Sequence, residues 1–146
     1  MFVLYFFLWT LLLYVVHRLA HALPYIKKIH SEHHRYVMRN RDWGIKWQDL
    51  YLSRGANKVT LDLWFTEVIP TLLFCAVTGH WWIFGAYYFW SAFYEKATKY
   101  NRDVDVFLVT WGMWTLTHYR RNTLNFGGIF SLWDIIFKTN RGINQI

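Results

Sequence analysis

The chain has 146 residues, which suits a single domain spanning residues 1–146. Hydrophobic side chains make up 55% of it and aromatic rings 22%, which excludes a disordered or fibrous protein and indicates a chain that faces lipid. The net charge of +7 suggests nucleic acid at first, but the cationic residues lie between apolar runs and form no known nucleic-acid module. We therefore expect contacts with lipid headgroups and no nucleic-acid partner.

The first predicted element is a membrane helix. Residues 1–16 contain one polar side chain, Thr10, and the helical pattern continues through HRLAHAL until Pro24 interrupts it. A signal peptide is the alternative interpretation. It is disfavoured because no cationic segment comes first and no small-residue cleavage site precedes His17.

The next segment, residues 27–58, is polar and basic, with amphipathic aromatic residues at Trp43, Trp47 and Tyr51. This composition is typical of the cytoplasmic membrane interface. It is followed by two apolar stretches, Leu61 to Thr78 and Trp81 to Tyr94, which Gly79 and His80 join. We expect a helical hairpin, and the lengths allow either a deep re-entrant hairpin or two full crossings. Cys75 lies in this apolar run, where a structural thiol is expected.

A last apolar segment, Val104 to Thr117, leads back to a basic region that starts at His118. The positive-inside rule places residues 17–58, 96–102 and 118–141 on one membrane face and His80 at the other. The predicted fold class is thus all-α: an integral-membrane, multi-pass helical bundle whose histidine-bearing helix ends lie on the cytosolic face.

Histidine spacing is the main functional signal. Five of the seven histidines lie between residues 17 and 34. If both stretches are helical, the pair His17 and His21 shares one helix face, and so does the trio His30, His33 and His34. Neutral imidazoles from several helix ends can surround iron, zinc or copper. A bis-histidine haem site is disfavoured because adjacent histidines such as His33 and His34 do not suit it.

Four segments in order resemble the fatty acid hydroxylase and sterol desaturase superfamily: HRLAH at 17–21, HSEHH at 30–34, the apolar hairpin, and NFGGIFSLWDIIFKT at 125–139. The resemblance implies a non-haem metal pair, held by HxxxH, HxxHH and a later HxxHH motif at the cytosolic membrane face, where oxygen is activated. On this chain the implied ligands are His17, His21, His30, His33, His34 and His118. The implied cofactor is a di-iron centre, which zinc can replace in isolated protein.

The chain also departs from the superfamily pattern. The third motif appears as TLTHY at 115–119 and retains only His118. Tyr100 occupies a position where similar sequences have a further histidine, and Lys138 replaces a glycine of the tail. Fewer imidazoles remain than the family offers, so the ligand set looks incomplete.

Acidic residues and phenols could complete the coordination. Asp62, Glu67 and Glu95 lie in or next to the hairpin, where they either bind the metal or pair with Lys or Arg. Tyr100 and Tyr119 are weaker ligand candidates, and the tryptophans suit bundle packing and interfaces better than a substrate channel. Asp134, with Glu67 as a second candidate, is expected to accept a histidine N–H and so orient a ligand.

Two functions remain open. The first is a membrane-bound non-haem metal oxidoreductase that hydroxylates or desaturates a fatty acyl or sterol C–H bond with O2. The resemblance implies an external electron donor for it, and the chain has no nicotinamide or flavin motif. The second is a catalytically degenerate member that binds a metal or a lipid in the membrane. Two metal ions per chain would favour the first, and one or fewer the second.

Overall fold

The computed structural model describes residues 1–39, 46–94, 113–121 and 123–140, and every regular element in these ranges is helical. Helix α1 runs from Phe2 to Ala22. It has no internal glycine or proline, and 21 residues give it a length of about 31 Å. It stops at Leu23, which is extended as expected for a residue before proline. The predicted first helix is therefore confirmed.

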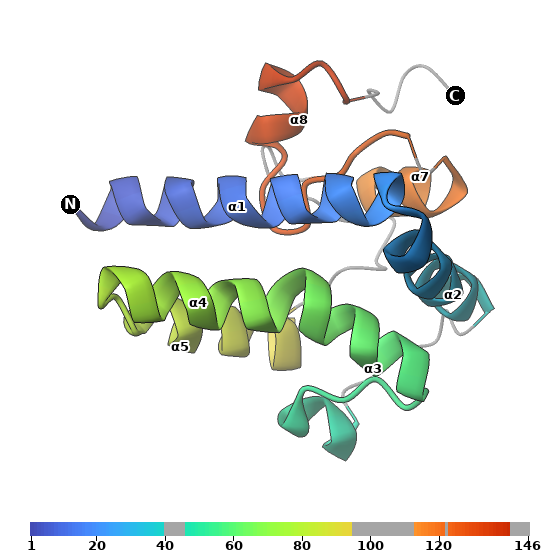
Figure 1. The fold of residues 1–146 in the computed structure, drawn as a ribbon, viewed down its shortest axis with the longest axis horizontal. Coiled ribbons are helices and arrows are strands. Elements are labelled where there is room, and N and C mark those ends of the chain that lie inside the picture. Colours follow the sequence, from blue (N-terminus) through green and yellow to red (C-terminus); the bar gives the residue numbers. More distant parts are fainter. Residues whose placement is uncertain (40–45, 95–112, 122, 141–146) are drawn as a thin grey trace.

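Pro24 both interrupts α1 and begins α2, which runs from Pro24 to Arg39. A proline is tolerated in the first helical turn, where its missing N–H leaves no broken bond. Helix α2 is amphipathic and packs across the end of α1 (Figure 1). Its buried residues are His30, His33, His34 and Val37. The short 3-10 helix η1, Trp47–Tyr51, follows.

The predicted hairpin is also confirmed. Its first arm is a continuous helix made of α3, Asn57–Leu63, the π-helical turn η2, Trp64–Val68, and α4, Ile69–Thr78. Gly79 then adopts φ 72°, which glycine reaches without a steric cost. The second arm consists of α5, Trp82–Phe89, and a second π-helical turn, η3, Trp90–Tyr94. The first arm begins at Asn57, four residues earlier than the hydropathy indicated.

Helix α1 lies beside the hairpin and antiparallel to its first arm (Figure 1). The core between them contains Trp9, Leu63, Val68, Cys75 and Tyr87. The indole N–H of Trp9 donates a 3.0 Å hydrogen bond to Thr71, which links α1 to α4 in this core. Cys75 is fully buried there, as expected for a structural thiol.

The C-terminal part packs on the opposite side of α1. Helix α7, Met113–Arg120, is followed by a loop and by α8, Leu132–Ile136. Trp133 of α8 donates a 3.0 Å hydrogen bond to Thr10, and Tyr14 bonds Thr139 at 2.8 Å. These bonds hold α8 and the residues that follow it against α1. Glu95, Tyr100, Trp111 and most of the predicted segment Val104 to Thr117 lie outside the described residues.

Among the described residues, two helices are long and apolar enough to span a membrane, namely Phe2–Ala22 and Asn57–Thr78. Only 22% of the apolar window of the first and 44% of the second is buried within the protein, so much of their apolar surface is exposed. Leu8, Val15, Leu73 and Val77 are among the exposed side chains. Apolar helices with this much exposed surface suit a lipid environment better than water.

Candidate metal centre

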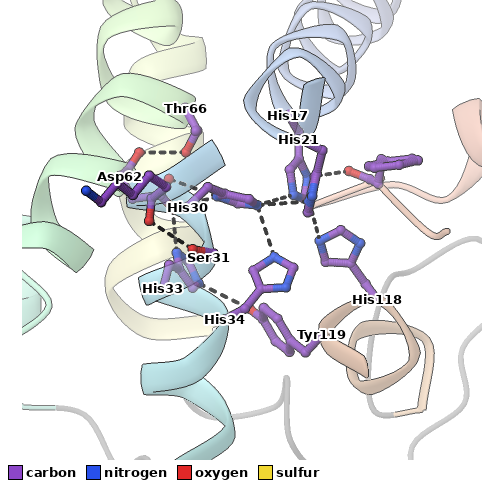
Figure 2. Close-up of polar contacts among 12 residues, drawn as sticks. His17, His21, His30, Ser31, His33, His34, Asp62, Thr66, His118 and Tyr119 are labelled. Carbon is purple, nitrogen blue, oxygen red and sulfur yellow. Dashed lines mark hydrogen bonds and ion pairs between the residues drawn. The ribbon is translucent and has the colours of Figure 1, made fainter. Parts of the chain in front are cut away.

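Five histidines from three helices meet at one end of the bundle. His17 and His21 belong to the last turns of α1, His30 and His34 to α2, and His118 to α7 (Figure 2). One ligand nitrogen from each lies within 4.8 Å of all the others. The predicted helical spacing explains the two pairs, and the crossing of α1, α2 and α7 joins them.

The Nε2 atoms form the centre of this cluster. His30 Nε2 lies 3.1 Å from that of His17, 3.0 Å from that of His21 and 3.0 Å from that of His34. His21 Nε2 is 3.2 Å from His118 Nε2. We call these five residues the five-histidine cluster.

Acceptors on the outer side of the rings determine which nitrogen carries the proton. His17 Nδ1–H donates to the carbonyl oxygen of Phe126 at 2.7 Å, and His118 Nδ1–H donates to that of Leu124 at 2.7 Å. A carbonyl oxygen can only accept, so each Nδ1 must hold the proton. In a neutral ring the Nε2 atom then carries a free lone pair, which is the form that binds a metal.

His30 is fixed in the same way by Asp62. Its Nδ1–H donates to the carboxylate of Asp62 at 2.8 Å, and Asp62 is only 1% exposed. Carboxylates that bind the outer nitrogen of a ligand histidine orient the ring and make its other nitrogen more basic. Asp62 also accepts a 2.6 Å hydrogen bond from His33 Nδ1–H, so one carboxylate orients two imidazoles.

This donor set fits a metal ion. In the neutral rings, protonated on Nδ1, the Nε2 atoms of His17 and His30 lie 3.1 Å apart, where two lone pairs repel unless a cation lies between them. Metal–nitrogen bonds of about 2.0–2.1 Å place neighbouring ligand nitrogens about 3.0–3.4 Å apart, which is close to the separations seen here. The five-histidine cluster is therefore compact enough to hold at least one ion.

His33 lies beside the cluster and not within it. Its Nε2 atom faces the hydroxyl of Tyr119, 3.4 Å away. Burial lowers the pKa of His33 to about 4, although the hydrogen bond to Asp62 opposes this shift. Burial, together with the neighbouring His118 and His30, holds the pKa of His34 well below its usual value. Both rings are therefore neutral near pH 7, as metal ligation requires.

Asp134 lies in α8, and its carboxylate binds the loop that precedes this helix. Its buried carboxylate accepts 2.7 Å hydrogen bonds from the backbone N–H groups of Phe126 and Gly127 and from the hydroxyl of Thr139. A direct histidine partner for Asp134 stays a prediction, and the carboxylate that binds two imidazoles in the described structure is that of Asp62. Asp134 acts on His17 indirectly, because it fixes the loop whose Phe126 carbonyl orients the His17 ring.

The remaining candidates are not members of the five-histidine cluster. Glu67 accepts a 3.2 Å hydrogen bond from Tyr87, and its role beside a ligand stays a prediction. His80 stacks on Tyr5 with ring centroids 3.8 Å apart, at the opposite end of α1 from His17. Thr115 belongs to α7, and its side chain lies outside the described part of the chain.

A cavity of about 50 Å³ opens beside the cluster. The apolar part of its lining consists of Leu13, Trp90 and Ile129 together with Gly127 and Gly128. Its polar part comprises four histidines, two acidic residues and three other polar residues: His17, His30, His33, His118, Asp62, Glu67, Thr66, Tyr119 and Asn125. It has room for about two water-sized groups. The histidines thus border a small space that is partly lined by apolar side chains from α1 and the hairpin.

Comparison of the sequence with known protein families assigns the chain to one of them. The model of the fatty acid hydroxylase family matches residues 2–139, nearly the whole chain. The chain belongs to the fatty acid hydroxylase family. No curated protein and no solved structure matches it significantly. The resemblance drawn from the histidine motifs and the C-terminal tail is confirmed. Membership of the fatty acid hydroxylase family points to an oxidoreductase of the lipid hydroxylase or desaturase type and to the use of a metal.

Proposed function

We propose that this fatty acid hydroxylase family member is a membrane-bound, metal-dependent oxidoreductase that hydroxylates or desaturates a fatty acyl or sterol C–H bond with O2. The observation that carries the proposal is the convergence of five histidine nitrogens within 4.8 Å of one another. Iron held by His17, His21, His30, His34 and His118 would supply the reduction of O2 and the oxidising power that an unactivated C–H bond requires.

The residues around the cluster orient its imidazole rings. The Phe126 and Leu124 carbonyls and the Asp62 carboxylate hold protons on the Nδ1 atoms, so that the Nε2 lone pairs point inward. The apolar wall of the adjoining cavity limits water and offers a hydrocarbon group a place next to the histidines. The cavity admits the reacting part of a lipid, and the rest of the chain would extend along the exposed apolar faces of the helices.

Electrons must come from elsewhere, because hydroxylation with O2 consumes two electrons and two protons beyond those of the substrate. Since the sequence contains no nicotinamide or flavin motif, an external electron donor is part of the proposal. The proposal also includes a multi-pass topology with the histidines on the cytosolic face. It rests on the cations at the histidine end of the helices, among them Arg18, Lys27 and Lys28.

The second candidate is a degenerate member that binds a metal or lipid without turnover. It is favoured by the pairing of His33 Nε2 with the Tyr119 hydroxyl, since the sixth inward histidine then faces a phenol and not the cluster. The two candidates share the fold and the five-histidine cluster. They differ in whether a lipid is oxidised.

Labelling with 18O2 in cells that express the chain tests the proposal. Hydroxylation should place 18O in a lipid, whereas desaturation should give an unlabelled lipid with a new double bond. His30→Ala should abolish either product, and His80→Ala is the matched control because His80 stacks on Tyr5 far from the cluster. If the purified wild-type protein contains metal but no lipid product forms, the second candidate, a member that binds metal without turnover, is correct.

A further inference from the structure

A second cavity, of about 240 Å³, lies on another side of the five-histidine cluster. Three cationic side chains line it, Lys27 and Arg35 of α2 and Arg120 of α7, together with Ser31 and the rings of His21 and His34. None of the described residues that line it is acidic. The cavity therefore has a strong excess of positive charge.

The spacing on α2 shows how this charge is brought together. Lys27, Ser31 and Arg35 are four residues apart, so they follow one another along a single face of the helix. Arg120, at the end of α7, adds a cation from a second helix. Glu32 would compete with a bound anion for Arg35, because the Arg35 Nη2 atom lies 3.4 Å from the Glu32 carboxylate. The Arg35 side chain in this ion pair is 59% exposed. Such an exposed pair is weak and yields readily to a stronger anion.

The cavity lies at the end of α1, and this position indicates which kind of ligand can reach it. His21 belongs to the last turn of α1, a helix that is long and apolar enough to span a membrane. The end of such a helix lies at the level of lipid headgroups. Lys27 and His21 also line a neighbouring cavity of about 300 Å³ that contains Arg18. The cations thus continue around the end of α1.

We infer that the cavity formed by Lys27, Ser31, Arg35 and Arg120 binds a phosphate group next to the five-histidine cluster. An arginine fork and a lysine point charge match phosphate oxygens, and the Ser31 hydroxyl adds a neutral donor. The phosphate belongs either to a lipid headgroup or to a soluble compound. This inference goes beyond the oxidation chemistry and does not depend on it, because binding can be measured on metal-free protein.

Calorimetry on the full chain in phosphate-free detergent tests the inference, with inorganic phosphate in one arm and micellar phosphatidic acid in the other. The triple variant Lys27→Gln, Arg35→Gln, Arg120→Gln should bind at least about tenfold more weakly. The control variant Lys28→Gln, Arg39→Gln, Lys58→Gln loses the same charge from exposed positions outside the lining and should bind like the wild type. Lys27→Gln alone covers the case in which the triple variant does not fold.

Tighter binding of phosphatidic acid than of inorganic phosphate would identify a lipid headgroup as the source, and equal binding would identify a soluble phosphate. The inference is overturned if the wild type binds neither probe, or if both triple variants weaken binding equally. The metal content of the same preparations reports separately on the proposed function, so the two can fail independently.

Discussion

The carboxylate of Asp62 accepts a 2.8 Å hydrogen bond from His30 Nδ1–H, across 32 residues of sequence. It connects the first arm of the hairpin to the helix that carries the HxxHH motif. The same carboxylate binds His33 at 2.6 Å. Because His30 Nε2 faces three other ring nitrogens, the orientation of this one ring determines the shape of the five-histidine cluster.

Asp62→Asn should therefore weaken metal binding by about 10–100-fold, since an amide loses the charge and one of the two acceptor oxygens. The measurement is metal affinity by competition with a chelator. Asp49→Asn is the control, because Asp49 is equally buried but accepts from the Lys46 N–H in η1. Equal affinity of the Asp62 variant and the wild type would refute the orienting role.

The two glycines of the NFGG segment should respond very differently to alanine. A Cβ atom on Gly127 would lie 2.5 Å from the Phe130 carbonyl oxygen and 2.7 Å from Asp134 Oδ2, whereas one on Gly128 would meet nothing within 4 Å. Gly127→Ala should cost about 1–3 kcal/mol of folding stability and displace the loop that orients His17. Thermal unfolding in detergent would show this loss, and Gly128→Ala should unfold like the wild type. Similar unfolding of both variants would contradict the described loop.

The helices and the two histidine pairs could be predicted from the local sequence pattern. Apolar runs predicted the helices, and the spacing of His17 with His21 and of His30 with His34 placed each pair on one face. Pro24 shows the limit of such reasoning, because the same residue ends one helix and begins the next. The sequence pattern alone indicates only the interruption, since a proline's effect on the following segment depends on where the chain turns.

The supports of the histidines could not be predicted in the same way. The acceptors for His17 and His118 are backbone carbonyls of Phe126 and Leu124, and a backbone carbonyl has no signature in residue type. Asp62 was recognised as a candidate ligand, but its two imidazole partners depend on the packing of α2 against α3. Asp134 drew attention as an acid in the family tail, although its partners are loop N–H groups.

Tyr119 gives a prediction about the number of metal ions. Its ring packs against His34 with centroids 5.0 Å apart, and its hydroxyl faces His33 Nε2. Tyr119→His would place an imidazole next to His33 and should raise the number of bound ions per chain. Tyr119→Phe, which removes only the hydroxyl, should leave that number unchanged. An unaltered count in the Tyr119→His protein would show that this side of the cluster does not form a second site.

Asp134→Asn should act mainly on stability. The buried carboxylate satisfies two backbone N–H groups and the Thr139 hydroxyl, and an amide cannot accept all three with the same strength. We expect a loss of about 1–3 kcal/mol in the unfolding free energy of metal-free protein, followed by weaker metal retention through the displaced His17 acceptor. Denaturant unfolding measures the first effect. Normal stability with reduced metal would instead indicate direct contact between Asp134 and a ligand.

The most direct test is the metal content of iron-reconstituted, detergent-purified protein, measured for the wild type, His30→Ala and His80→Ala. The five-histidine cluster predicts at least one tightly bound ion per wild-type chain, the same content in His80→Ala, and nearly none in His30→Ala. A wild type that retains no metal, or equal retention by the two variants, would contradict the account.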